Sequence, residues 1–98
     1  MTIHQRSTTS DLKDRARATI DARRPALLDL SHRLHADPEI GWQEVRSSAL
    51  VADALGAGGF DVTRGVAGMP TAILARAGDG PLHLAILAEY DALPGIGH

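Results

Sequence analysis

The sequence contains no cysteine, so this segment can form neither a disulfide nor a thiolate metal site. Long apolar runs are also missing, because the longest is far too short to span a bilayer. Residues 1–10 are polar and lack the apolar stretch of a signal peptide. A formal net charge of −2 gives no electrostatic reason to expect a nucleic-acid or anionic-membrane partner. We therefore expect a soluble, cytoplasmic protein.

The length of the chain suits one small domain. A chain of 98 residues buries only about 60 to 65% of its unfolded surface, so the stability margin is expected to be narrow. No internal repeat, linker or low-complexity tract divides it. We expect residues 1–10 to form a flexible tail and residues 11–98 to form a single folded portion.

A first helix is expected over residues 11–36, with Ser10 or Asp11 as its cap. Because Pro25 falls inside this range, either the helix kinks there or a second helix begins with Pro25 in its first turn. The helix should end by Asp37, because Pro38 disfavours the helical conformation in the residue before it. Its apolar side chains recur at helical spacing on one stripe: Ile20, Leu27, Leu30 and Leu34.

A second helix is expected over residues 44–55. Glu44 at its start complements the positive end of the helix dipole, and the glycines of residues 56–59 end it. Between the two helices, Trp42 is expected to anchor the loop of residues 37–43 against the domain.

About three strands are expected in the second half of the chain. Residues 60–64 and 71–77 have the composition of short strands. Residues 82–88 are apolar at nearly every position, which is typical of a strand buried on both faces of a largely parallel sheet. The compact turn at residues 78–81 predicts that the last two strands pair as an antiparallel hairpin. The expected fold class is α/β, with two helical regions and then a mixed, mostly parallel sheet flanked by helices.

Two carboxylates, Glu89 and Asp91, directly follow the last apolar strand. In open α/β sheets, ligands and metals are held at the carboxyl ends of the strands. Such a pair could bind a metal, orient a histidine ligand, or act as acid and base. Alternatively, Asp91 caps the turn at residues 92–95 and Glu89 is simply solvated.

Other polar residues are weaker candidates. His32 and His35 share one helical face and could grip a metal, but no acidic or third imidazole partner is close in sequence, and both could instead be partly buried hydrogen-bonding residues. His83 lies roughly 17 Å from the carboxylate end of its strand. Residues 65–70 have neither the P-loop Lys-Ser/Thr pair nor a dinucleotide fingerprint, so a turn is expected there.

Three motifs in order resemble one enzyme family. Residues 85–98, Ala-Ile-Leu-Ala-Glu-Tyr-Asp-Ala-Leu-Pro-Gly-Ile-Gly-His, look like the first metal-site motif of the zinc metallopeptidase and amidohydrolase family. Residues 34–41 with Glu44 are similar to its helix-to-loop signature, and residues 65–72 resemble its loop before the second strand. The family includes aminoacylases, glutamate carboxypeptidases, hippurate hydrolases and aminobenzoyl-glutamate hydrolases.

The resemblance implies roles for individual residues. Family members commonly carry His-x-Asp at this strand end, where the His binds zinc and the Asp orients it. Asp91 matches that Asp, whereas Glu89 occupies the His position, as in the amidohydrolase branch. Asp91 is therefore expected to act by orienting a metal-binding imidazole. Glu89 is expected to line the site, with direct metal binding left open, and His98 would line it as the residue two before an expected Cys.

The resemblance also implies a function. The complete enzyme would use two zinc or manganese ions to cleave the amide bond of N-acyl amino acids, aminobenzoyl-glutamate-like conjugates or short peptides, possibly as a homodimer. Its general base and paired metal-binding glutamates have no counterpart in these 98 residues. We therefore expect an incomplete N-terminal portion of a catalytic domain that is inactive alone. The alternative is a small non-catalytic α/β binding or regulatory module derived from that fold.

Overall fold

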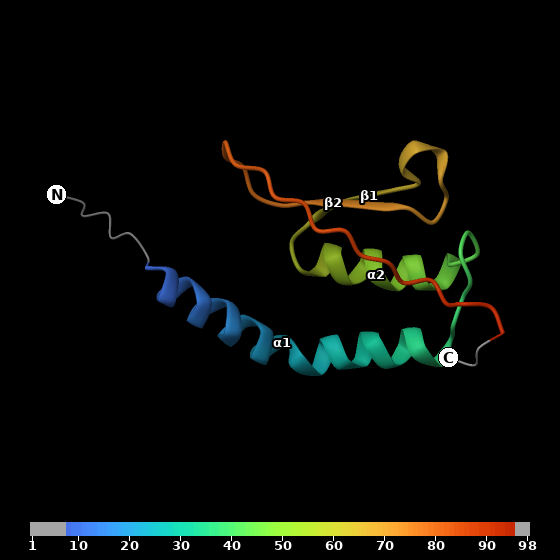
Figure 1. Cartoon of the computed structure of the whole chain (residues 1–98), viewed down its shortest axis with the longest axis horizontal. Coiled ribbons are helices and arrows are strands. Elements are labelled where there is room, and N and C mark those ends of the chain that lie inside the picture. Colours follow the sequence, from blue (N-terminus) through green and yellow to red (C-terminus); the bar gives the residue numbers. More distant parts are fainter. Residues whose placement is uncertain (1–7, 96–98) are drawn as a thin grey trace.

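The computed structural model describes residues 8–95 and is a mixed α/β structure (Figure 1). Helix α2 lies between α1 and a two-stranded sheet, and it contacts both (Figure 1). Residues 1–7 of the predicted tail lie outside the described residues, and Thr9 already belongs to a helix. The elements follow in the order α1 (Thr9–Ala36), α2 (Val45–Ala57), β1 (Asp61–Arg64), the 3-10 turn η1 (Val66–Gly68) and β2 (Ile73–Arg76).

Helix α1 begins with a capping box. The Thr8 hydroxyl accepts a hydrogen bond from the Asp11 N–H at 3.0 Å, and the Asp11 carboxylate accepts one from the Thr8 N–H at 3.3 Å. The prediction of Asp11 or the serine before it as N-cap was therefore wrong. Pro25 lies inside one continuous helix, so no second helix begins there. The end at Asp37, before Pro38, is confirmed.

The apolar stripe of α1 is only partly covered. Within residues 9–36 no side chain is buried, and Ile20 and Leu27 are 56% and 48% exposed. The N-terminal half of α1 extends past the end of α2 (Figure 1). Over the described range 8–95, no helix is both long and apolar enough to cross a membrane.

Helix α2 supplies most of the small core. It confirms the second predicted helix and ends at Gly58, whose N–H donates to the carbonyls of Ala54 and Leu55. Ser48 is the most deeply buried described side chain, and its hydroxyl donates to the Val45 carbonyl at 3.0 Å. This bond satisfies a polar group that would otherwise be buried without a partner. The other buried residues of the helix are Ser47 and Ala52.

Strands β1 and β2 form an antiparallel pair that packs on α2. Their register runs from Asp61 opposite Arg76 to Arg64 opposite Ile73. Gly65 leaves β1 with φ of 73°, a left-handed conformation that suits glycine, and its N–H donates to the Ala72 carbonyl. The two predicted strands at residues 60–64 and 71–77 are confirmed with shorter bounds, but they pair with each other.

The third predicted strand, residues 82–88, is not part of a sheet. No strand in the described chain pairs with it, and Leu84, Ile86 and Leu87 are 86%, 94% and 97% exposed. The predictions of three strands, of a mostly parallel sheet and of a hairpin between residues 71–77 and 82–88 were therefore wrong. A strand buried on both faces needs hydrogen-bonded neighbours and covering helices, and residues 8–95 provide neither for this segment.

Candidate functional site

The candidate site is built on residues 89–92, which are held between two other parts of the chain. The Ala92 N–H donates to the Glu39 carbonyl at 2.7 Å, next to an isolated parallel bridge between Ile40 and Ala92. The Tyr90 hydroxyl donates to the Thr71 carbonyl. The segment is thus tied both to the loop between α1 and α2 and to the start of β2.

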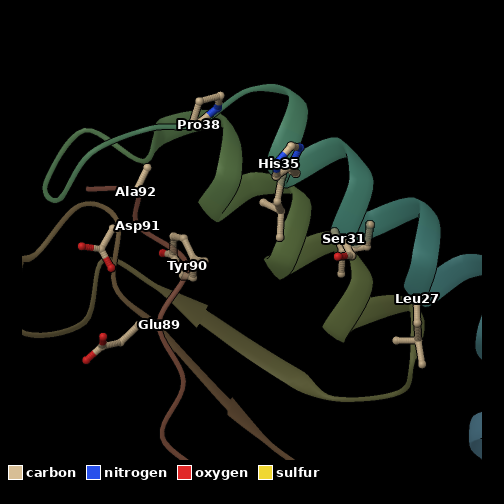
Figure 2. Close-up of a pocket in the computed structure, with 10 residues that line it drawn as sticks. Leu27, Ser31, His35, Pro38, Glu89, Tyr90, Asp91 and Ala92 are labelled. Carbon is tan, nitrogen blue, oxygen red and sulfur yellow. The ribbon is translucent and has the colours of Figure 1, made fainter. Parts of the chain in front are cut away.

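Glu89 and Asp91 project from the same side of this segment. Both side chains are exposed and directed away from α1 (Figure 2). Tyr90, which lies between them, and Ala92, which follows Asp91, are both half-buried. This alternation is expected for an extended chain, in which successive side chains face opposite sides. A Cβ placed on Gly41 would lie 3.5 Å from the Asp91 carboxylate, so that carboxylate sits over Gly41. The two acids predicted from the sequence therefore face the same side of the segment.

The phenol of Tyr90 lies among charged groups. Burial raises its pKa, and the negative charge of Glu44 raises it further, while Arg64 opposes that effect. The hydroxyl therefore keeps its proton at neutral pH and remains a donor. Among the described residues, one carboxylate oxygen of Glu44 is buried without a hydrogen-bond partner.

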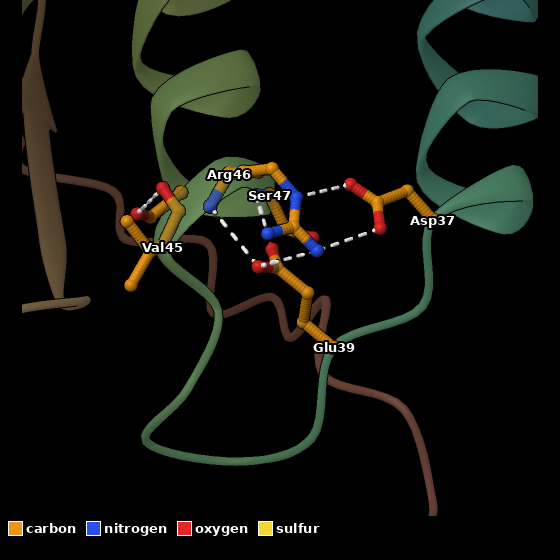
Figure 3. A network of polar contacts seen from close by, with 6 residues as sticks. Asp37, Glu39, Val45, Arg46 and Ser47 are labelled. Carbon is orange, nitrogen blue, oxygen red and sulfur yellow. Dashed lines mark hydrogen bonds and ion pairs between the residues drawn. The ribbon is translucent and has the colours of Figure 1, made fainter.

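A carboxylate on the adjoining loop holds the start of α2. The Glu39 side chain accepts hydrogen bonds from the Ser47 N–H at 2.6 Å and the Arg46 N–H at 3.2 Å (Figure 3). Burial of Glu39 would raise its pKa, but these bonds from Ser47 and Arg46, with the Arg46 charge, outweigh burial and lower it. Glu39 is therefore ionised at neutral pH and acts as a remote cap of the helix.

Arg46 links this cap to the end of α1. Its guanidinium donates to both Asp37 carboxylate oxygens, at 2.5 and 2.8 Å, and lies 3.5 Å from Glu39 (Figure 3). The hydrogen bond from Arg46 lowers the pKa of Asp37. Trp42, at the tip of the same loop, is 73% exposed, so the prediction that it anchors the loop was wrong. Polar bonds at Asp37 and Glu39 hold the loop instead.

A cavity of about 350 Å³ lies beside residues 89–92. His35 lines this cavity (Figure 2), whereas His32, which was considered with it as a possible metal ligand, does not. Its lining combines apolar residues of α1 with the site segment: Leu27, Leu30, Ser31, Leu34, His35, Pro38, Glu89, Tyr90, Asp91 and Ala92.

The described residues do not fit a metal centre by themselves. Nowhere in residues 8–95 do three or more His, Asp or Glu side chains gather so that they could hold a metal ion. Glu89 and Asp91 therefore lack a third protein ligand within this range. The predicted site residue His98 lies outside the described residues, and His83 is exposed on residues 82–88.

Three residues of the site were missed by the sequence reasoning: Glu39, Arg46 and Tyr90. An acidic residue shortly before a predicted helix is a signal that could have indicated Glu39 as a helix cap. No comparable local signal identifies Tyr90, because its hydrogen-bond acceptor lies 19 residues away in sequence.

Comparison with known proteins indicates what this region resembles. No protein-family model matches the chain. The chain is 39% identical over 77 residues to one of the subunits of the p-aminobenzoyl-glutamate hydrolase of Escherichia coli (strain K12), a match that covers 79% of this chain and 16% of that protein. It is 36% identical over 70 residues to thermostable carboxypeptidases 2 and 1 of Saccharolobus solfataricus, covering 69% of this chain and 18% of each.

The chain thus spans less than a fifth of the length of these relatives. Their names describe whole proteins, of which the matched stretch is a small part. The similarity supports a relation to amidohydrolases and peptidases at the level of the family, and to no narrower group.

Proposed function

We propose that this chain contributes part of the catalytic domain of a metal-dependent hydrolase that cleaves amide bonds. The observation that carries the proposal is the 39% identity over 77 residues to a protein named as p-aminobenzoyl-glutamate hydrolase. The two relatives named as carboxypeptidases also support the proposal that an amide bond is cleaved. The proposed substrates are N-acyl amino acids, aminobenzoyl-glutamate-like conjugates or short peptides.

The geometry of Glu89 and Asp91 supports a role for both residues. Their carboxylates are exposed on one side of a segment that is fixed by hydrogen bonds on either side of Asp91. In the proposal, Asp91 accepts a hydrogen bond from the ring N–H of a histidine of the complete protein and so orients that imidazole. Glu89 lines the same site.

The exposed residues 82–88 support the idea that further protein completes the domain. Their aliphatic side chains form an apolar stretch of a kind that soluble domains normally cover. The proposal includes two divalent ions, zinc or manganese. Because residues 8–95 provide no set of three ligands, the ligands of those ions would come from elsewhere in the complete protein.

A chimaera tests the proposed function. The matched 77 residues of the Escherichia coli p-aminobenzoyl-glutamate hydrolase would be replaced by those of this chain, and hydrolysis of p-aminobenzoyl-glutamate would be measured. We expect hydrolysis that is abolished by a chelator and restored by zinc or manganese. Asp91→Ala in the chimaera should lower kcat/KM by about 10- to 100-fold.

The matched control is Asp53→Ala on the exposed side of α2, which should leave kcat/KM unchanged. A folded chimaera that binds the metal ions but shows no hydrolysis would contradict the proposal. Equal activity of the Asp91→Ala and Asp53→Ala chimaeras would remove Asp91 from the proposed site.

A further inference from the structure

We propose that Tyr90 is a positioning residue for Glu89 and Asp91. Through the hydrogen bond from its hydroxyl to the Thr71 carbonyl, it fixes the side of the chain from which the two carboxylates project. The inference rests on the proposed function, because it matters only if these carboxylates line a site. It concerns an orientation, so it can be tested without substrate.

The alternation of burial along the segment carries the first step. Glu89 and Asp91 are exposed, whereas Tyr90 and Ala92 are half-buried. The preceding residues 82–88 are exposed on both faces, so they gain no burial that would favour one orientation of the chain over the other. The facing of Glu89 and Asp91 is therefore decided at residues 90–92.

The acceptor of the Tyr90 hydrogen bond is well held. Thr71 is only 8% exposed and lies just before β2. Its neighbour Ala72 donates to the Met69 carbonyl and accepts from the Gly65 N–H. The Thr71 carbonyl, which accepts the hydrogen bond from the Tyr90 hydroxyl, is thus part of the closed end of the β1–β2 hairpin and can serve as a fixed point.

The Tyr90 hydroxyl holds the segment in addition to the backbone hydrogen bond of Ala92. The bond from the Ala92 N–H to the Glu39 carbonyl fixes one point of the backbone, at 2.7 Å. This bond belongs to the parallel bridge between Ile40 and Ala92, which joins the segment to the loop between α1 and α2. Tyr90 adds a tie to a second element through the Thr71 carbonyl, and a phenylalanine ring could fill the same space but could not donate.

Rotation of the segment would be unfavourable for both kinds of side chain. It would turn Glu89 and Asp91 toward the apolar surface of the chain and expose the Tyr90 ring. Burial of ionised carboxylates without partners is strongly disfavoured.

The first measurement uses the unmodified chain, in which Tyr90 is the only tyrosine. The tyrosine Fermi doublet in the Raman spectrum reports whether the phenol donates a strong hydrogen bond. We expect the doublet of a donor to a carbonyl. A doublet typical of a phenol that both donates to and accepts from water would overturn the inference, with no substitution that could disturb folding.

The second measurement compares Tyr90→Phe with Trp42→Phe, a control at an exposed aromatic residue. The readout is the pair of Hα–Hβ couplings of Asp91 measured by NMR. A single staggered rotamer gives either one large and one small coupling or two small ones, whereas averaging over rotamers gives two intermediate values. We expect the couplings of a single rotamer in the unmodified chain and in Trp42→Phe, and intermediate couplings in Tyr90→Phe. Far-ultraviolet circular dichroism should be the same for all three.

The outcomes separate this inference from the proposed function. Unchanged Asp91 couplings in a folded Tyr90→Phe variant would overturn the positioning role, whatever the hydrolysis assay shows. Averaged couplings together with a chimaera that is insensitive to Asp91→Ala would uphold the positioning role and contradict the proposed function.

Discussion

The Glu39 carboxylate accepts a 2.6 Å hydrogen bond from the backbone N–H of Ser47, eight residues further along the chain. Its other oxygen accepts from the Arg46 N–H, so one loop side chain satisfies two donors at the start of α2. Glu44, the residue at the N-cap position, makes no such bond. The cap of α2 therefore also fixes the loop whose Glu39 carbonyl receives the Ala92 N–H of the candidate site.

Replacement of Glu39 by Ala should destabilise the fold measurably. The substitution leaves two helix N–H groups without their acceptor, and loss of a helix cap lowers the Tm of a domain of this size by roughly 4 to 8 °C. Glu39→Gln should lower the Tm less, because the amide keeps one acceptor oxygen. Asp53→Ala is the control and should leave the Tm unchanged. Equal melting temperatures for Glu39→Ala and the unmodified chain would show that water replaces the cap without loss.

Stability should fall in acid because of Asp37 and Glu39. Their pKa values in the folded state lie below the ordinary values of 3.8 and 4.5. A lowered folded-state pKa contributes stability that is present above the unfolded value and is lost as the pH falls through the folded value. The urea midpoint should therefore be level from pH 7 to about 5 and decrease below that.

The double variant Asp37→Asn, Glu39→Gln provides the comparison for this pH dependence. It should start from a lower midpoint at pH 7 and lose less between about pH 5 and 3 than the unmodified chain does. If both proteins showed the same acid dependence, other carboxylates would be responsible for it.

Lysine at position 86 should reduce association without unfolding the chain. Ile86 is 94% exposed on an unpaired extended segment, a kind of segment that templates strand pairing between molecules. Ile86→Lys should change the free energy of unfolding by no more than about 0.5 kcal/mol and lower light scattering. Ala52→Lys, at a position only 6% exposed in α2, should unfold the chain. A cooperative loss of structure in Ile86→Lys would mean that residues 82–88 pack within the molecule.

Glycine should be better than alanine at position 42, the reverse of the usual order. Trp42 has φ of 70°, a left-handed conformation that costs a non-glycine residue about 1 to 2 kcal/mol. Trp42→Gly should therefore be more stable to urea than Trp42→Ala by about 1 kcal/mol. The same pair of substitutions at the exposed neighbour Gln43, which has no positive φ, should show alanine as the more stable residue. Alanine ahead of glycine at both positions would contradict the strain at Trp42.

Local sequence features predicted the helices well. The end of α1 at Asp37 follows from the steric demand of Pro38, and the end of α2 follows from the glycines after it. The capping box of Thr8 and Asp11 is also a local pattern, although the sequence reasoning placed the cap two or more residues too late. These features succeed because helix formation depends on residues within a few positions of one another.

The sequence pattern located β1 and β2 but assigned the wrong partner to β2. An apolar run shows that a segment favours an extended conformation, but it does not show which neighbour completes its hydrogen bonds. Residues 82–88 illustrate the difference: they are extended yet unpaired, because residues 8–95 offer them no complementary edge.

The order of residues was enough to show that two carboxylates, Glu89 and Asp91, follow an apolar extended run, and its motifs pointed to the hydrolases that the comparisons support. How those carboxylates face could be learned only from the packing of the folded chain. Their orientation is tied to the bond from Tyr90 to Thr71 and to the bond from Ala92 to Glu39, and each of these bonds joins residues that are far apart in the sequence. Such contacts form only when separate elements pack together, because no local propensity specifies a hydrogen bond across that span.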